Sequence, residues 1–233
     1  MKYNEIKISK DGTYFIYKNE PIFNKQFLEI LKFHSEGFAP VCDKSGWYHI
    51  NLQGKELYKE RYDRTFGYYF ERTSVVLNKN WFHLNVKGEK IHSAFYSWTG
   101  NYQENICSVR DFKNNYFHIN LLGERTYTEN YLYVGDYKDG IACVKTKKGF
   151  NHINEKGQII NNKTFLDLGV FHKNYATAKD KNGWFHIDKN GVELYKERYL
   201  IIEPFYNGFS LVETFENKKQ IIDENGIKTI EIE

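Results

Sequence analysis

Five histidines recur at nearly constant spacing, and their side chains are the first candidates for chemistry in this chain. They are His49, His83, His118, His152 and His186. Imidazoles at equivalent positions of a repeat could line a stripe that binds a metal ion or a phosphate. The same position holds Phe15 and Ile221 near the two ends of the chain. This exchange favours a packing position that accepts large flat or apolar side chains.

The expected spacing also favours packing over metal binding. Equivalent residues of neighbouring strands or sheets lie roughly 5–10 Å apart, whereas zinc ligands lie about 2 Å from the metal. The cysteines add no cluster, because Cys42, Cys107 and Cys143 fall at three different places within their repeats. We predict structural histidines, free structural thiols, no metal site and no cofactor.

A second candidate set lies in a turn that recurs in each repeat but varies in sequence. The copies read KFHSEG, YYFERT, NYQENI, DYKDGI, VFHKNY and PFYNGF. Positions that maintain the repeated structure need the same residue type in each copy. Loop positions that vary between copies are therefore candidates for recognition. The candidate ligand-binding residues are His34, Glu71, Arg72, Gln103, Glu104, Asp136, Lys138, Asp139, His172, Lys173, Glu203 and Tyr206.

Three interpretations of these turns remain open. They are polar because exposed turns face water, or they recognise a protein, a peptide or a small polar ligand. In the third, they carry acid–base catalysis on a small polar or carbohydrate-like substrate, with Glu104 and Asp136 as a pair or His172 with an acidic partner. No Gly-x-Ser-x-Gly, phosphate-binding glycine loop or His-Glu-x-x-His motif occurs, so catalytic residues stay unknown. We predict a non-catalytic binding or scaffolding module, with the enzyme as the alternative.

Both candidate sets depend on an internal repeat. GWYHINLQGKELYKERY, from Gly46, returns from Gly183 as GWFHIDKNGVELYKERY. Aliphatic residues follow the aromatic positions at spacings of 34 or 35 residues, at Ile16, Ile50, Leu84, Ile119, Ile153, Ile187 and Ile222. Seven copies in register predict one repeat domain over residues 1–233, with degenerate terminal copies.

Each repeat reads as β-structure. IACVKTK, GWFHID and VELYKERY predict three strands, and segments such as YLYVG predict a short fourth one. Asn/Asp-x-x-Gly, as at Asp188 to Gly191, predicts a turn with a left-handed glycine. The aromatics Trp47, Trp81, Tyr116, Phe150 and Trp184 keep one register, which favours the core over a sugar- or cation-binding stripe.

A repeat of this size buries its faces only by stacking on its neighbours. We predict an all-β, seven-bladed β-propeller-like fold, which removes exposed sheet edges. An open superhelix of stacked β-hairpins, a solenoid, is the alternative. In a propeller the variable turns would ring one mouth of the central channel.

The paired Gly-Trp residues, the Asn/Asp-x-x-Gly turn and the closing Arg-Tyr resemble the bacterial WG-repeat family over nearly the whole chain. Gly-Trp is intact at Gly46-Trp47 and Gly183-Trp184, while other copies read Asn80-Trp81, Asn115-Tyr116 and Gly149-Phe150. The resemblance implies β-rich modules that are sometimes appended to enzymes, and it implies no shared catalytic activity.

Composition narrows the expected partners. The chain has 233 residues, 33 basic and 30 acidic, with a formal net charge of +3. This balance makes nucleic acid an unlikely partner, and no apolar run predicts a membrane segment or a signal peptide. Three cysteines without a CxxC spacing fit a reducing cytoplasm. The expected partner is a protein, including an enzyme encoded nearby, or a small polar ligand.

Overall fold

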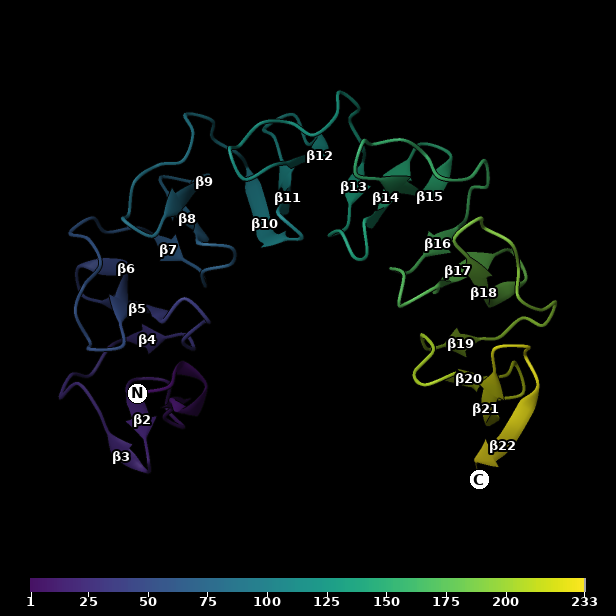
Figure 1. Ribbon diagram of the computed structural model, residues 1–233, viewed down its shortest axis with the longest axis horizontal. Coiled ribbons are helices and arrows are strands. Elements are labelled where there is room, and N and C mark those ends of the chain that lie inside the picture. Colours follow the sequence, from purple (N-terminus) through teal and green to yellow (C-terminus); the bar gives the residue numbers. More distant parts are fainter. Residues whose placement is uncertain (233) are drawn as a thin grey trace. The chain divides into compact units, whose positions relative to one another are not determined.

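The computed structural model describes residues 1–232, which form an all-β chain (Figure 1). Within this range the strands form seven antiparallel sheets, each of three strands except the last, which has four. The number of sheets matches the seven copies of the repeat. We call each sheet a blade and name it by its strands.

The chain divides into two compact units. Unit 1 contains Met1–Asn114 and Ile119–Glu124, and unit 2 contains Asn115–His118 and the residues from Arg125 onward. The division passes through β12 (Tyr116–Ile119). The single-domain organisation of residues 1–233 stays a prediction.

Unit 1 begins with a short 3-10 helix and continues with strands up to the division. Its elements are η1 (Tyr3–Glu5), β1 (Lys7–Ile8), β2 (Phe15–Tyr17), β3 (Glu20–Pro21), β4 (Glu29–Ile30), β5 (Phe38–Asp43), β6 (Gly46–Asn51), β7 (Arg64–Thr65), β8 (Arg72–Leu77), β9 (Asn80–Asn85), β10 (Trp98–Gln103) and β11 (Ile106–Arg110).

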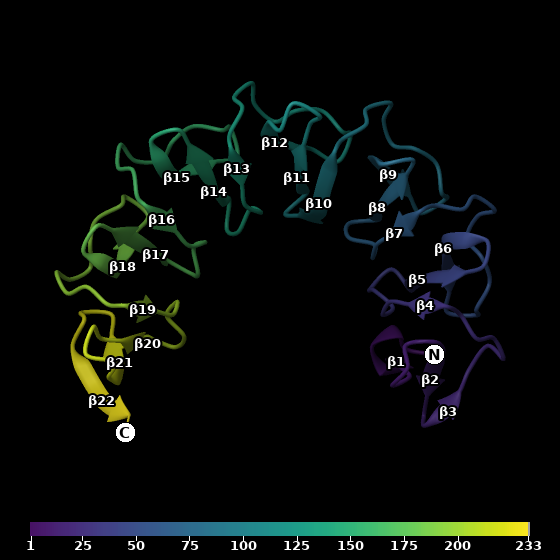
Figure 2. The same cartoon turned by 180° about the vertical axis from the view of Figure 1, so that it is seen from behind.

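Unit 2 continues the same pattern in three further blades (Figure 2). Its strands after β12 are β13 (Tyr133–Val134), β14 (Ile141–Thr146), β15 (Gly149–Asn154), β16 (Asp167–Leu168), β17 (Tyr175–Asp180), β18 (Gly183–Asp188), β19 (Ile201–Ile202), β20 (Phe209–Glu213), β21 (Lys219–Asp223) and β22 (Lys228–Ile232). A short first strand precedes a longer hairpin in each of these blades, as YLYVG and GWFHID predicted.

The recurring aliphatic residues form the blade cores. Ile50, Leu84, Ile153 and Ile187 are all buried, each on the last strand of its blade's long hairpin. Because successive side chains of a strand point to opposite faces, the histidines one position earlier face the other side. This places two buried layers on each hairpin.

The Asn/Asp-x-x-Gly turn is confirmed. In its first full copy the Gly54 amide donates to the Asn51 carbonyl over 2.9 Å, and the Asn51 side chain accepts from Gln53 and Lys55 amides. Gly54 has a φ of +74°, and a Cβ there would lie 2.6 Å from the Phe23 ring. Glycine is therefore required twice, for the backbone conformation and for packing between neighbouring blades.

The predicted strand VELYKERY is wrong. Its equivalent in the β4–β6 blade makes only isolated bridges, Ile50 to Glu56 and Trp47 to Tyr62. Three residues of β6 separate Ile50 from Trp47, whereas six residues separate their partners Glu56 and Tyr62. The two segments therefore cannot pair residue by residue as in a regular β-ladder. The excess residues turn Tyr58 inward instead. A full fourth strand exists only as β22, in the last blade of the described residues.

The glycine of Gly-Trp has a conformational role. Gly46, Gly149 and Gly183 have φ values of +122°, +136° and +138° directly after a two-residue hairpin connection. In the β7–β9 blade the connection itself takes positive φ at Asn78 and Lys79, so Asn80 is tolerated there. The second turn conformation therefore explains why the β7–β9 blade has Asn80 where other copies have glycine.

The core assignment of the register aromatics holds for one residue only. Trp47 is buried, but Trp81, Tyr116, Phe150 and Trp184 are half-buried. Their outer faces carry neighbours, such as the Phe66 ring stacked on Trp81 at 5.1 Å between ring centroids. These aromatics flank the blades, and the following position carries a buried ring in every one of these blades except that of Phe150, where Asn151 follows.

Candidate functional site

The recurring histidines are structural, as predicted. In the β4–β6 blade, His49 Nδ1 lies 2.5 Å from the Tyr58 hydroxyl and Nε2 lies 2.7 Å from the Phe66 carbonyl oxygen. His118 repeats this with Tyr127 and Gly135, and His186 with Tyr195 and Glu203. In these three blades each ring joins its own blade to the next first strand, and both nitrogens are used.

Burial sets the protonation state of these rings. It lowers the pKa of His49, His118, His152 and His186 to about 4 and that of His83 to about 3. The rings are neutral at pH 7. Among residues 1–232 no three His, Cys, Asp or Glu side chains gather as a metal site, and the three cysteines are free thiols.

Two blades depart from the histidine–tyrosine pair. In the β7–β9 blade, His83 Nδ1 lies 3.3 Å from His92 Nε2. In the β13–β15 blade, His152 Nε2 lies 2.8 Å from the Gly169 carbonyl oxygen, but Asn161 stands nine residues later, where three other blades have tyrosine. His152 Nδ1 and Asn161 Nδ2 are both buried without a hydrogen-bond partner. Buried polar atoms without partners cost free energy, so this blade has a local defect.

We expect Asn161→Tyr to raise the free energy of unfolding by about 1–2 kcal/mol, because a tyrosine hydroxyl would pair with His152 Nδ1. Gly191 leaves the space for such a ring, as Gly226 does for Tyr195. Urea unfolding at neutral pH measures the change. Tyr195→Phe, which strips a partner from His186, is the converse control and should lower the free energy by about 1–3 kcal/mol. A loss of stability in Asn161→Tyr would refute the interpretation.

The variable turns are tight hairpins. Tyr69 pairs with Arg72, Lys138 with Ile141, His172 with Tyr175 and Tyr206 with Phe209. The two residues between the partners take positive φ at Phe70 and Glu71, Asp139 and Gly140, and Asn207 and Gly208, and also at Glu104 and Asn105 between the paired Gln103 and Ile106. These are features of a type I′ turn, which is typical of two-residue β-hairpins. Between His172 and Tyr175 only Lys173 has a positive φ.

The pairing changes one residue of the predicted register. Tyr69 corresponds to Gln103 and Lys138, so Phe70, and not Glu71, holds the position of Glu104. Glu71 is the second turn residue, and its amide donates to Glu36 Oε1 over 3.4 Å. Arg72 follows the turn, and its guanidinium donates to the Phe70 and Leu121 carbonyls. Arg72 therefore braces the turn.

A groove of about 410 Å³ lies beside the turns of unit 1. Ile8, Leu31 and Phe66 supply its apolar lining, and Lys32, His34, Tyr69 and Asn101 supply its polar lining. The His34 ring lies against the Tyr69 ring at a centroid distance of 4.8 Å. The predicted residue His34 therefore belongs to a built groove rather than to a free loop.

Gly67 makes room for the His34 ring. A Cβ on Gly67 would lie 2.1 Å from His34 Nε2, so a larger residue would displace the imidazole. Burial and the Lys32 charge lower the pKa of His34, while burial and the Glu36 carboxylate raise the pKa of Tyr69. At neutral pH the groove thus presents an uncharged imidazole and an uncharged phenol.

The remaining predicted residues are spread over both units. In unit 1, Gln103 ends β10, and Glu104 is the first residue of the turn that joins β10 to β11. In unit 2, His172 contacts the Tyr206 ring at 5.0 Å between centroids, and Asp136, Lys138, Asp139 and Lys173 are exposed on neighbouring turns. Glu203 lines a small cavity of about 190 Å³, and its backbone carbonyl oxygen forms a hydrogen bond with His186 Nε2.

No acid–base pair of the predicted kind is brought together within a unit. Glu104 belongs to unit 1 and Asp136 to unit 2. Among the described residues, no carboxylate forms a hydrogen bond with the His172 ring, whose aromatic partner is Tyr206. The catalytic alternative therefore gains no specific observation.

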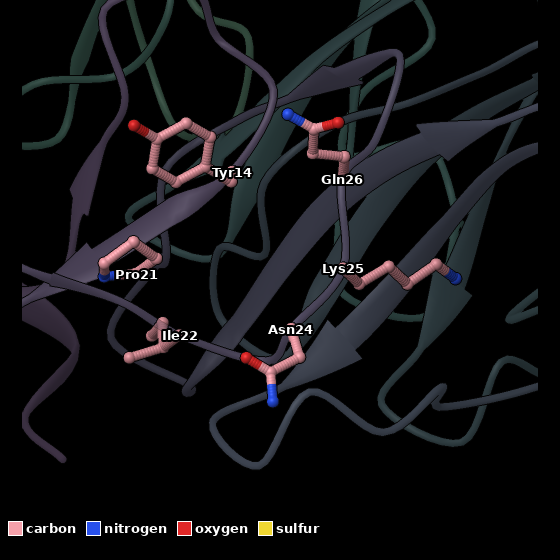
Figure 3. Close-up of a pocket in the computed structure, with 6 residues that line it drawn as sticks. All are labelled: Tyr14, Pro21, Ile22, Asn24, Lys25 and Gln26. Carbon is pink, nitrogen blue, oxygen red and sulfur yellow. The ribbon is translucent and has the colours of Figure 1, made fainter.

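A further pocket of about 380 Å³ lies at the N-terminal blade, between Tyr14, Pro21, Ile22, Asn24, Lys25 and Gln26 (Figure 3). Its charged residue is engaged elsewhere, because Lys25 Nζ lies 2.6 Å from the Tyr48 hydroxyl and 3.3 Å from Asp43 Oδ2. The pocket therefore offers mainly neutral groups. No helix of residues 1–232 combines the length and apolar character needed to cross a membrane.

Most of the groove was not predicted from the sequence. Leu31, Phe66, Tyr69 and Asn101 were not candidates, because only polar residues of the turns were considered. The segments YYF and KFH do place aromatic residues in the turns near His34. Their convergence depends on contacts between neighbouring blades, which the sequence of a single repeat does not specify.

Comparisons with known proteins identify the fold. No protein-family model matches the chain, and comparison with curated proteins gives no match. A solved structure of a eukaryotic initiation factor has a TM-score of 0.62 at 12% identity, with 98% of this chain and 72% of that chain covered. BamB from Moraxella catarrhalis has a TM-score of 0.53 at 10% identity, with 100% and 86% covered.

The computationally designed Ika8 protein is similar at a TM-score of 0.53 and 10% identity, with 97% of this chain and 83% of that chain covered. At such identities the similarity concerns the fold alone. The all-β, propeller-like prediction is confirmed by these neighbours and by the repeated antiparallel blades.

Proposed function

We propose that this protein is a non-catalytic binding module that docks a peptide segment of a partner protein beside the turns of unit 1. The observation that carries the proposal is Phe70. This aromatic side chain is 44% exposed and sits at a φ of +51° on the tip of a type I′ turn, directly after Tyr69, which lines the groove.

Phe70 is costly for folding in two respects. Type I′ turns favour Asn, Asp and Gly because both central residues have positive φ, and a bulky residue there is strained. Other turns of this chain use Asp139-Gly140 and Asn207-Gly208. A strained, exposed aromatic ring at a turn position that holds Asp139 and Asn207 in two other blades supports a role in recognition.

The groove suits a peptide better than a small polar ligand. Its apolar lining accepts an aliphatic or aromatic side chain, and its polar lining offers groups to the flanking backbone. The register of β10 shifts between Thr99 and Tyr102, and Asn101 lies in that irregular stretch. Bulges of this kind re-aim side chains next to functional sites.

The proposal includes membership of the WG-repeat family and a cytoplasmic location. Gly46 and Gly183 share the same positive-φ conformation before tryptophan, which supports a common repeat. The closing arginines behave alike, since Arg61 lies 3.8 Å from the Tyr48 ring centroid and Arg198 3.7 Å from that of Phe185. Three free thiols are typical of a reducing compartment.

A random-peptide display library selected on the immobilised protein tests the proposal. We expect enriched peptides with an apolar anchor residue, and loss of their binding in Phe70→Asn and Gly67→Ala. Phe70→Asn places a favoured residue in the turn, so it should keep or raise stability. Gly67→Ala should displace His34 from the groove.

Gly135→Ala is the matched control, because Gly135 has no positive φ and the nearest atom to an added Cβ is 3.6 Å away. It should bind the enriched peptides as the wild type does. Either no enrichment at all or equal binding by all four proteins would refute docking at this groove.

A further inference from the structure

The β13–β15 blade breaks the repeat pattern at a position that the four other blades with the recurring histidine fill with an aromatic ring. The equivalents are Tyr48, Phe82, Phe117 and Phe185, and all four are buried. A cation covers each ring, with Arg125 3.9 Å from the Phe117 centroid and Lys90 4.6 Å from that of Phe82. In β15 the residue is Asn151, which is only 5% exposed.

The residues around Asn151 change with it. Thr164 stands where Arg61 and Arg198 cover their rings, and Asn161 stands where three other blades have tyrosine and one has His92. The smaller side chains leave a pocket of about 420 Å³ on this blade. Since aromatic packing is the rule elsewhere in the frame, the opening results from several coordinated changes.

The lining of the pocket is held in place by hydrogen bonds. Asn151 Nδ2 donates to the Lys163 carbonyl over 2.7 Å and to Thr164 Oγ1 over 3.2 Å. Asn161 Oδ1 accepts from the Lys163 amide over 3.1 Å, which leaves Nδ2 as a buried donor without a partner. A buried donor at a pocket wall is a site that a ligand oxygen would satisfy.

The charge at the pocket has one sign. Lys147 and Lys148 lie at its edge and are exposed, while the other lining residues are Thr, Asn and one Ile. No carboxylate belongs to the lining. Amide, hydroxyl and ammonium donors without a competing acid are the groups that bind an oxyanion.

We propose that this pocket is a second binding site, specific for a small oxyanion, either a phosphate or a carboxylate group of a soluble ligand. Asn161 Nδ2 and the Thr164 hydroxyl supply neutral donors, and Lys147 and Lys148 supply charge. The site lies wholly within unit 2, so it is independent of the groove proposed for peptide docking.

Thermal unfolding with inorganic phosphate, acetate or chloride at matched ionic strength tests the site. A ligand that binds only the folded state raises the melting temperature saturably. We expect a saturable rise with phosphate or acetate and none with chloride, and the two arms identify which oxyanion is preferred. No saturable rise with either oxyanion would overturn the proposal.

Asn151→Phe installs the aromatic residue of the other blades and fills the pocket. It should fold with a melting temperature at or above that of the wild type and lose the oxyanion-dependent rise. The double variant Lys147→Ala/Lys148→Ala keeps the core intact and should weaken binding about tenfold or more.

Lys44→Ala is the matched control, because Lys44 occupies the hairpin position of Lys147 in the β4–β6 blade. It should keep the wild-type response. If Asn151→Phe and the double-lysine variant both respond like the wild type, the effect is a general ionic one and the site does not exist. If Asn151→Phe does not fold, the double-lysine variant decides alone.

Discussion

Lowering the pH from neutral to about 4 should unfold the protein, because five buried histidines are neutral in the folded state. Burial lowers the pKa of four of them from 6.5 to about 4 and that of His83 to about 3. The ring nitrogens of His49 and His118, for example, form hydrogen bonds inside the blades and away from water. Adding a proton to such a ring therefore costs free energy in the folded state.

The direction follows from proton linkage. Between the folded pKa, near 4, and the unfolded pKa of 6.5, the unfolded chain binds more protons than the folded one. Stability is therefore complete above the unfolded pKa and falls as the pH drops through this window. At pH 4 each depressed histidine lowers the free energy of unfolding by about 3 kcal/mol. Five together remove about 15 kcal/mol, which is the upper end of the usual 5–15 kcal/mol stability of a domain.

Circular dichroism and tryptophan fluorescence against pH measure this loss. His152→Phe removes one titrating group and one buried atom without a partner, and phenylalanine already occupies the equivalent position at Phe15. The variant should unfold at lower pH than the wild type. A free energy of unfolding that does not change between pH 7 and pH 4 would contradict the assignment of neutral buried rings.

Gly149→Ala should lower the free energy of unfolding by about 2–4 kcal/mol. Gly149 has a φ of +136°, and a Cβ there would lie 2.5 Å from the Phe165 carbonyl oxygen. That oxygen accepts the Phe150 amide in the bridge that closes the blade. Relief of the clash would break this hydrogen bond, so both the backbone strain and the lost bridge contribute.

Urea unfolding of Gly149→Ala is best compared with Gly135→Ala. At Gly135 the φ is not positive and the added methyl group meets no atom closer than 3.6 Å. The control should be neutral or gain up to about 1 kcal/mol, because alanine restricts the unfolded chain. Equal destabilisation by both substitutions would mean that the Gly-Trp glycine is not required by its conformation.

Much of the fold could be predicted from the sequence because equivalent residues recur at constant spacing and so align the repeats with one another. Ile50 and Ile187 hold equivalent places, and the glycine after each marks the same turn. The structural role of the histidines followed from their exchange with Phe15. Their tyrosine partners, nine residues later at Tyr58, Tyr127 and Tyr195, were equally visible in the sequence and were overlooked.

Other features could not be predicted from the sequence pattern. VELYKERY alternates well enough for a strand, but its bridged residues are six positions apart while their partners on the neighbouring strand are three apart. The segment therefore does not form a continuous β-ladder. Polar turn residues such as Glu104 and Asp136 were expected around one mouth, yet the built groove is lined by Leu31, Phe66 and Asn101. Residues from four blades form it, most of them apolar or neutral.

The sequence by itself determined the all-β class, the number of repeats, the buried histidine position and the turn glycines. A recurring residue type at constant spacing reports a recurring environment, and that is local information. Only the tertiary structure decided which turns meet, that Gly67 holds the His34 ring, that Phe70 has positive φ, and that Asn151 opens a pocket. These facts depend on backbone conformation and on contacts between neighbouring blades, which no single repeat specifies.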